Sequence, residues 1–550
     1  MITAKTKYRT ERIDHLGIVS GICQEIGLAE TIDKQIGENG RQVSVGQAAQ
    51  AMVLNGLGFA SRALYLTPEF YRNKPVDVLI GEGITAEMLN DDSLGDGLDR
   101  MYEAGVTELF AEVAARACAH YGIETRLHHL DSSSFHLHGE YESVESDEGA
   151  ITVTQGYSRD HRPDLKQVVV SLVTTHQAAI PTWLEALSGN SDDKSSFPRT
   201  VAAYQKQLVS DEASYFVADS ALYSQANIQQ LSTVFWVTRV PLTLKSAKQV
   251  LAASGAVAAQ LEPEGWEEII PGYQGREYGS IYGGVKQRWW VIFSQAAYDR
   301  ESKTFARQLA KAEAKAQAAL AKLEKETFAC QPDAEQAMAK AAAKWRYHRP
   351  VIQVEPVLGY GQRGRPAKGR KPTIQGYRIT GEVVVKAARL AELEQKRGKF
   401  IIATNQLQAE KLSAAEMLSA YKDQGVTVER GFRFLKDPMF FADSLFLKKP
   451  SRLMALLMVM GLSLLVYALA ERQLRQALEK NDQTIPDQVG KPTQRPTMRR
   501  VFQMFEGIDL LIIVLAGQIV GRQVLNLRPV HEQIVTLLGP AVKNIYIPPD

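Results

Sequence analysis

Three acidic residues stand at positions where they could hold divalent metal ions together. Asp131 falls within a predicted strand, Asp219 closes another predicted strand, and Glu429 lies on a predicted helix much later in the chain. Carboxylate oxygens are the ligands that Mg²⁺ prefers, and two such ions can drive an in-line displacement at phosphorus. The pattern predicts phosphodiester chemistry, with these acids as catalytic residues and as ligands of two Mg²⁺ ions, which Mn²⁺ would replace.

Two cations accompany the third acid on its predicted helix. At 100° per residue, Arg433 and Lys436 share a face with Glu429. Cations beside an acid suit the binding of a DNA backbone next to a metal centre. A solvated helix face held by salt bridges would have the same composition, so composition alone leaves both interpretations open.

The elements that must position these residues form a predicted α/β sheet. Strands are expected at 126–141, 165–175 and 178–187, then a helix at 196–213 and strands at 214–220 and 234–240. Three consecutive strands followed by alternating helix and strand are typical of a sheet with mixed strand directions. Ala-, Lys- and Glu-rich segments on either side of Gln331 predict an αα-hairpin. The apolar run 453–470 is long enough to cross a membrane, but a buried helix is favoured.

The predicted domain order follows from these patterns. We expect a helical N-terminal domain, a catalytic domain in two parts separated by an insertion of strands and an αα-hairpin, and a C-terminal helical region; the boundaries are 1–122, 123–240, 241–398, 399–480 and 481–550.

Bulk composition excludes some classes of protein. The chain has 550 residues, 45% of them hydrophobic and 23% charged, and a formal net charge of +2. Its three cysteines, Cys23, Cys118 and Cys330, form no CxxC pair, which argues against a zinc ribbon or a disulfide framework. The first residues have no apolar signal segment, so a reducing cytoplasm is expected. Because the net charge is small, any nucleic-acid partner must be recognised by local patches.

Four segments together resemble a known family. They are HLDSSSFHLHG around Asp131, GYSRDHRPDLKQVVVSLV at 156–172, ADSALYS at Asp219 and ERGFRFLKDP from Glu429. The chain resembles the DDE transposases of bacterial insertion sequences, in the insertion-sequence-four superfamily, in the branch with a long helical N-terminal domain. The resemblance implies an RNase H-like mixed sheet with an insertion before the third acid. It also implies cut-and-paste transposition of double-stranded DNA by a homodimer associated with the nucleoid. The partners would be target DNA and terminal inverted repeats, which the N-terminal domain is expected to bind. Because the buried-helix interpretation of 453–470 is favoured, no membrane partner is expected.

One part of the family pattern is altered. The third-acid helix of the family carries Tyr, Arg, Glu and Lys, but Lys422 and Gly425 stand here where Tyr and Arg are expected. Tyr421, one residue away, remains a candidate phosphate contact. Glycine and the β-branched run after it should weaken the helix locally. Glu416 is an alternative third acid, and a catalytically silent DNA-binding relative is the alternative function.

Two basic segments are further candidates for DNA contacts. The first, GYSRDHRPDLKQ, offers Arg159, Arg162 and Lys166, although pairing of its aspartates with the arginines would account for it equally well. The second is a Gly/Pro-rich loop without acids that carries Arg363, Arg365, Lys368, Arg370 and Lys371.

One pair of tryptophans and one pair of histidines are the last candidate functional residues. Trp289 of Trp289-Trp290 could stack on a base, although core packing is the commoner use of such a residue. His136 and His138 have the i,i+2 spacing of two zinc ligands on one strand face. A polar strand face is the simpler interpretation, because spacing indicates no third ligand.

Overall fold

A computed structural model describes residues 6–38, 40–59, 64–138, 149–158, 162–207, 213–255, 265–361, 364–365, 368–437 and 447–549. The chain divides into two compact units. Unit 1 comprises Met1–Thr238, Tyr282–Val285 and Ser419–Asp550, and unit 2 comprises Arg239–Ile281 and Lys286–Leu418. All three predicted acids belong to unit 1.

Unit 1 begins with one strand and a group of short helices. Helix α3 has a capping box, in which the Ser44 hydroxyl accepts the Gln47 N–H at 3.1 Å and Ser44 N–H donates to the Gln47 side chain at 3.0 Å. The elements are β1 (Lys7–Arg12), α1 (Leu16–Glu25), α2 (Leu28–Ile36), α3 (Val45–Gly56), η1 (Leu64–Leu66), α4 (Thr67–Tyr71), α5 (Val76–Leu79), η2 (Ala86–Met88), α6 (Asp91–Glu103) and α7 (Val106–His120).

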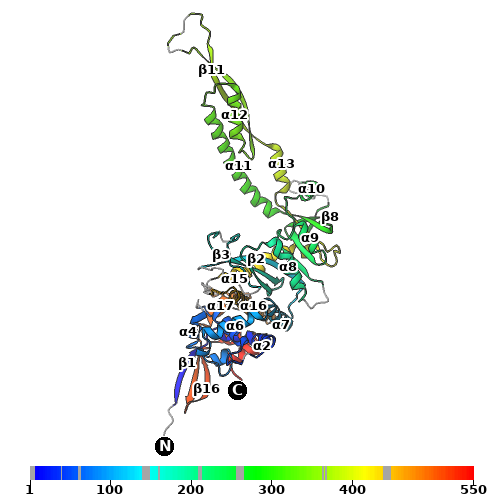
Figure 1. Ribbon diagram of the computed structural model, residues 1–550. Helices are drawn as coiled ribbons and strands as arrows, with labels where there is room; N and C mark the ends of the chain where they lie inside the picture. Colours follow the sequence, from blue (N-terminus) through cyan, green and yellow to red (C-terminus); the bar gives the residue numbers. More distant parts are fainter. Residues whose placement is uncertain are drawn as a thin grey trace. The chain divides into compact units, whose positions relative to one another are not determined.

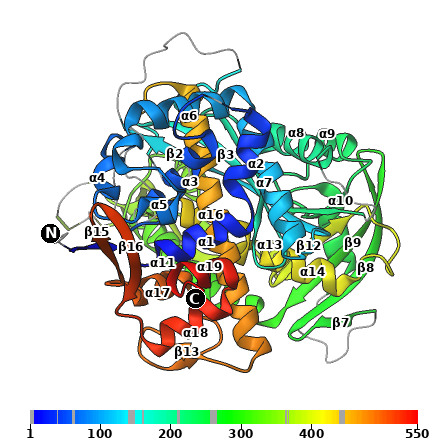
Figure 2. The same cartoon turned by 90° about the horizontal axis from the view of Figure 1, so that it is seen from below.

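The long apolar helix α16 (Pro450–Lys480) forms the centre of this unit. It is the one helix among the described residues that is long and apolar enough to cross a membrane, and 83% of its apolar window is buried. Figure 2 shows α16, in orange, among α1, α3, α6 and α7, which all pack against it. The prediction of a buried helix is therefore confirmed, and an apolar surface on every side of α16 is explained by burial in a protein core.

Five strands of unit 1 form the sheet that the sequence predicts. Their order is β4-β3-β2-β5-β6. The first three neighbours are antiparallel, whereas β5 and β6 run parallel to β2. This mixed order is the RNase H-like arrangement that the resemblance implies. The strands and the helices between them are β2 (Leu127–Leu137), β3 (Lys166–Thr175), β4 (Pro181–Ser188), α8 (Asp193–Gln205), β5 (Tyr215–Ala218), α9 (Gln225–Gln230) and β6 (Phe235–Arg239).

The C-terminal region differs from the prediction of an all-helical segment. Strands β15 (Asp509–Leu515) and β16 (Gln518–Leu525) form an antiparallel hairpin, and β1 pairs with β15. A short apolar run such as DLLIIVL is compatible with either a helix or a strand. It forms a strand here because it pairs with β1, which lies about 500 residues earlier in the chain. The remaining elements are β13 (Ile485–Pro486), β14 (Pro492–Thr493), α17 (Met498–Met504), α18 (Pro529–Leu537) and α19 (Pro540–Tyr546).

Unit 2 contains four strands in the order β12-β9-β8-β7 and a separate hairpin of β10 and β11. The predicted αα-hairpin is present as α11 and α12, which pack on β10 and β11 around Leu320, Ala334, Met338 and Ile379 (Figure 1). The elements are α10 (Lys245–Ala253), β7 (Glu267–Ile270), β8 (Tyr273–Tyr282), β9 (Val285–Ser294), α11 (Gln295–Leu323), α12 (Gln331–Ala342), β10 (His348–Gly359), β11 (Thr373–Val385), α13 (Ala387–Lys396) and β12 (Lys399–Thr404).

Candidate active site

The first acid lies on the central strand of the unit 1 sheet. Asp131 is half-buried in the middle of β2, between β3 and β5. Its Oδ1 accepts the N–H of Ser132 at 2.8 Å, which fixes the orientation of the carboxylate. Across the antiparallel pair, Asp131 stands opposite Leu172 of β3. Because paired residues of neighbouring strands project from the same face, Leu172 marks the face that carries the acid.

The second acid follows the neighbouring parallel strand. Asp219 comes directly after β5, where the chain turns, and its Oδ1 accepts the N–H of Ala221 at 2.8 Å. Its backbone carbonyl accepts the hydroxyl of Thr238 of β6 at 2.7 Å. These two bonds hold the turn that ends the strand, so Asp219 is fixed at the strand end where open α/β sheets place their ligands.

The strand register relates the two aspartates. Leu127 pairs with Tyr215 and His129 with Val217 across β2 and β5. Continued by two residues, this register sets Asp131 level with Asp219, on strands about 4.8 Å apart. Asp219 itself lies one residue past the end of β5, so the register brings the two aspartates to the same level of neighbouring strands.

The helix that carries the third acid covers the sheet face that Leu172 marks. Helix α15 (Val428–Leu435) buries Val428, Gly431, Phe432 and Leu435. Gly431 lies so close to the sheet that an added Cβ would stand 2.8 Å from Cδ2 of Leu172, the residue opposite Asp131. Glycine is required here for close approach rather than for its backbone angles.

A second contact fixes the direction of α15. The Lys436 ammonium lies 5.4 Å from the ring centroid of Phe135, which shares the strand face of Asp131 because the two are four residues apart. Glu429 is two turns earlier on the helix, about 10 Å away along its axis. Asp131 is four residues earlier on β2, about 13 Å away. The exposed Glu429 therefore stands at the Asp131 end of α15.

The helix is broken just before the third acid, as the glycine and β-branched residues predict. Helix α14 (Ala414–Asp423) gives way to the 3₁₀ turn η3 (Gln424–Val426), and α15 starts afresh at Val428. The side chain of Gln424 donates to the carbonyl of Leu130 at 3.4 Å, beside Asp131. The half-buried Tyr421 lies on α14, before the break, so it does not share a continuous helix with Glu429.

A group of ionic contacts around the buried carboxylate of Glu471 holds α15 in place. Glu471 of α16, whose side chain is 5% exposed, pairs with Arg430 and lies 2.8 Å from Arg475. Its Oε2 also accepts the N–H of Met498, at the start of α17, at 3.2 Å. A buried carboxylate with this many donors is compensated, so the contacts anchor the helix that bears Glu429.

The donor set fits a hard divalent cation, because three carboxylates are available and no thiolate competes. The side chains are not gathered, however. Within the described ranges, no group of three or more His, Cys, Asp or Glu residues could hold one metal ion. The Glu429 carboxylate turns back toward Gly425, whose added Cβ would stand 3.4 Å from its Oε2. The same finding removes support for zinc at His136 and His138; the His136 ring instead lies 3.4 Å from the Ser158 hydroxyl.

The basic turn before β3 is partly neutralised. Arg162 forms a salt bridge with Asp164 at 2.8 Å, and its hydrogen bond lowers the pKa of Asp164 to about 2. This is the local pairing that the sequence left open. Lys166 begins β3 and is half-buried, and Arg159 lies outside the described residues.

The candidates of unit 2 divide into two kinds. Trp289 is fully buried on β9, and its indole N–H donates to Gln287 at 2.8 Å. A ring buried in the core offers no exposed face to a base, which favours the core-packing interpretation of this residue. Between β10 and β11, the side chains of Arg365, Lys368, Arg370 and Lys371 are exposed, whereas Arg363 lies outside the described residues.

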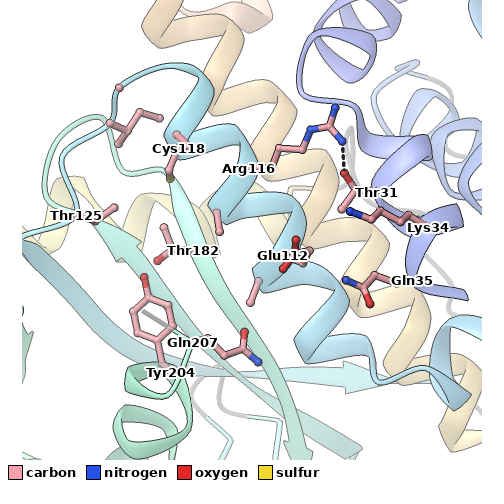
Figure 3. Close-up of a pocket in the computed structure, with 15 residues that line it drawn as sticks. Thr31, Lys34, Gln35, Glu112, Arg116, Cys118, Thr125, Thr182, Tyr204 and Gln207 are labelled. Atoms are coloured by element: carbon pink, nitrogen blue, oxygen red, sulfur yellow. Dashed lines mark hydrogen bonds between the residues drawn. The ribbon is translucent and has the colours of Figure 1, made fainter. Parts of the chain in front are cut away.

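A pocket of about 660 Å³ lies elsewhere in unit 1, among α2, α7, β4 and α8. Figure 3 shows Thr182 and Tyr204 at one end and Lys34 and Arg116 at the other, where Arg116 donates to the hydroxyl of Thr31 at 3.0 Å. None of the three acids lines it. The candidate site is therefore the face of the unit 1 sheet on which α15 packs, and not this pocket.

Sequence reasoning missed the residues that support α15. Gln424, Arg430 and Glu471 were not singled out, because each acts through a partner that is distant in the chain: Leu130 for Gln424, and Glu471 for Arg430. A buried Glu at the end of the apolar run 453–470 was the one available signal, since glutamate is almost never fully buried without a partner.

Comparison with known proteins agrees with the geometry. Residues 123–467 match the model of the transposase DDE domain family, and residues 8–115 match a domain of unknown function (DUF4277). No curated protein sequence matches the chain.

Solved structures were also compared. A piggyBac transposase synaptic complex with hairpin DNA is 8% identical, covers 91% of this chain and 82% of its own, and has a TM-score of 0.36. A Mos1 transposase paired-end complex with the left transposon end is 11% identical, with a TM-score of 0.15; the match covers 37% of this chain and 60% of the Mos1 chain.

The sheet order, the two aspartates at the same level of neighbouring strands and the third-acid helix that packs on the sheet thus coincide with a family match over more than half of the chain. The chain belongs to the DDE transposase family.

Proposed function

We propose that this DNA transposase cuts DNA at the ends of its own insertion sequence and joins the freed ends to target DNA. Asp131, Asp219 and Glu429 are the proposed catalytic residues. The observation that supports this assignment is the convergence on one region of the sheet: the register of β2 and β5 aligns the two aspartates, and α15 packs over Leu172 beside Asp131.

Both proposed steps are in-line displacements at phosphorus. In the first, a water oxygen loses a proton and bonds to phosphorus, the P–O3′ bond breaks, and the departing 3′ oxygen takes up a proton and leaves as a hydroxyl. In the second, that 3′ oxygen attacks a target phosphate, loses its proton and displaces a target 3′ oxygen. Bound divalent ions, Mg²⁺ or Mn²⁺, would activate the attacking oxygen and neutralise the leaving one. The chain contributes the three carboxylates that would hold two such ions.

Cations of the chain would position the DNA. Arg433 is exposed on α15 and Lys436 caps its end, both on the side of Glu429. Charge-assisted hydrogen bonds from such residues to phosphates fix register without reading sequence. We assign the same role to Lys166 and to the exposed loop cations of unit 2. Tyr421 and the paired Arg162 are weaker candidates. Terminal repeats bound by the N-terminal domain, and a homodimer on paired ends, are proposed from the family resemblance.

A second candidate function is that of a catalytically silent DNA-binding relative. Two observations favour it: the Glu429 carboxylate turns toward Gly425, and the Tyr and Arg positions of the family signature are altered. This protein would bind the ends without cutting them.

The deciding experiment compares the wild type with Glu429→Gln on a duplex that carries the element's own end, with Mg²⁺ or Mn²⁺. Glu416→Gln is the matched control, because the Glu416 carboxylate caps α14 through the Ser413 N–H at 2.9 Å. We expect cleavage by wild type and control, and binding without cleavage by Glu429→Gln. Cleavage lost only in the control would move the third acid to Glu416. Binding without cleavage by all three proteins would favour the silent relative.

A further inference from the structure

Helix α11 in unit 2 carries a row of cations that the candidate active site does not use. Every member has an exposed side chain. At 100° per residue, all six fall within one sector of about 120° and extend over about 33 Å of helix. The row, named here the α11 stripe, consists of Arg300, Lys303, Arg307, Lys311, Lys315 and Lys322.

The stripe points away from the protein. The opposite side of α11 is the packed one, where Ala316 and Leu320 are buried and the Phe305 ring lies edge-on to Tyr347 at 5.5 Å between centroids. Figure 1 shows α11 beside α12 and β11, the elements that cover its packed side. All six cations are therefore presented to solvent on a rigid helix.

No acid neutralises the stripe. In the part of the chain that the structure describes, none of its six members forms a salt bridge within 4.0 Å. The acids of α11 are engaged by neutral donors: Asp299 accepts from Gln295 at 2.8 Å, Glu301 from Gly398 N–H at 2.9 Å, and Glu313 from Gln317 at 3.2 Å. A helix surface that served only solubility would alternate acids and bases at i,i+4 spacing. In the α11 stripe, three successive i,i+4 pairs between Lys303 and Lys315 instead join two cations.

We propose that the α11 stripe binds the phosphate backbone of duplex DNA, an inference that rests on the proposed function and extends it to a second surface. A length of about 33 Å matches one turn of B-DNA, about 34–36 Å. Exposed cations in such a row displace condensed counterions from phosphates, which gives affinity without reading base sequence. With a net charge of only +2 for the chain, this concentration of charge is local.

Helix α11 runs toward the basic loop between β10 and β11, to which we assign DNA binding above. After α11 ends at Leu323, Phe328 pairs with Tyr377 of β11, four residues from the strand end at Thr373 where the loop cations lie. The C-terminal end of the stripe, at Lys322, is thus its end nearer the loop. One backbone path could contact both groups.

The test uses full-length protein and a labelled duplex of arbitrary sequence, about four helical turns long. Lys303, Lys311 and Lys315 are changed together to Gln, which preserves helix propensity. The matched control changes Lys248, Lys340 and Lys344, three exposed lysines of the same unit outside the stripe. The logarithm of the association constant is measured against the logarithm of salt concentration, and circular dichroism melting checks that each variant folds.

The stripe variant should lower the slope by about 2.7, since each phosphate contact contributes about 0.9. The wild type then loses about 40-fold more affinity than the variant between about 0.05 and 0.2 M salt, and the control stays within one contact of wild type. Equal effects of both triple variants, or no effect of the stripe variant, overturn the proposal. Binding to vesicles that contain anionic phosphatidylserine is measured in parallel. A stripe variant that binds these vesicles more weakly than wild type, but binds DNA as wild type does, also overturns the proposal.

Cleavage of the element end is read separately in the same preparations. If DNA binding depends on the stripe but the protein never cleaves the element end, the α11 stripe is supported as a DNA-binding surface and the proposed cleavage mechanism is refuted. If the protein cleaves the element end and the stripe variant has the same salt slope as the wild type, the transposase mechanism is kept and the proposal for the α11 stripe is overturned.

Discussion

The close approach of α15 to the sheet can be tested by a single methyl group. In Gly431→Ala the new Cβ would stand 2.8 Å from Cδ2 of Leu172 and 3.3 Å from Cδ2 of Leu464. Carbon atoms pack at about 3.5–4.0 Å, so α15 or Leu172 must move by about 1 Å. Leu172 is fully buried opposite Asp131, so we expect the helix to move and to carry Glu429 with it.

Two terms oppose each other in the stability of this variant. Overpacking costs about 1–3 kcal/mol, while replacing glycine by alanine within a helix returns up to about 1 kcal/mol. The free energy of unfolding should therefore fall by no more than about 2 kcal/mol. A shift of about 1 Å in a catalytic group can cost about 100-fold in rate, so cleavage should fall far more than stability.

The assay measures single-turnover cleavage of the element end, binding of the same duplex, and the urea midpoint. Gly17→Ala on α1 is the control, because its Cβ would meet Cε2 of Tyr546 at 2.7 Å, in a similarly tight contact that involves none of the three acids. The expected result is a loss of cleavage of about 100-fold for Gly431→Ala alone, with binding preserved. Wild-type cleavage by a stably folded Gly431→Ala protein would refute the claim that this contact positions Glu429.

Three further predictions concern buried groups. Glu471→Gln should lose about 1.5–3 kcal/mol of unfolding free energy, because it removes the charged acceptor that Arg430, Arg475 and the Met498 N–H share; an unchanged urea midpoint would count against the anchoring of α15. Trp289→Phe should lose about 1–3 kcal/mol by leaving the Gln287 oxygen without its donor, with duplex affinity unchanged; weaker binding at equal stability would favour the stacking role. Burial lowers the pKa of His129 to about 3, so the unfolded chain binds a proton below about pH 6.5 that the folded chain refuses, and stability present above pH 6.5 should fall toward pH 3 by up to about 1.4 kcal/mol per pH unit. Urea midpoints measured against pH should show a shallower decline for His129→Gln.

The parts of the fold that were predictable are those with a local signal. The sheet strands of unit 1 were predicted from apolar runs bounded by turns, and α16 from its length and lack of charge. The break before Glu429 was also local, because Gly425 and Val426-Thr427-Val428 weaken a helix where they stand. In each case the residues that determine the element lie within it.

The remainder depends on partners that the sequence does not identify. Alternation along β9 indicates that one of Trp289 and Trp290 points inward, but not which; both are buried. The strand character of 509–515 depends on β1, and the placement of α15 depends on a contact between Gly431 and Leu172. Pairing of Arg162 with Asp164 was one of two balanced alternatives until the geometry was known.

The pairing of the two chain ends has a consequence for how the protein is made. Strand β1 has its hydrogen-bonding partner in β15, the Ile13 N–H donates to Ile508 at 3.0 Å, and the Tyr546 hydroxyl donates to the Asp14 carbonyl at 2.5 Å. A ribosome adds about 5–20 residues per second, so the first strand waits roughly 25–100 s for its partner. During that interval the emerging helices of the N-terminal domain have an uncovered apolar side. We expect a chain stopped at residue 508 to be cut by protease within residues 8–115 faster than the complete chain. Resistance equal to that of the complete chain would contradict this view. A ribosome that stalls late would then release a product whose N-terminal domain is not stably folded.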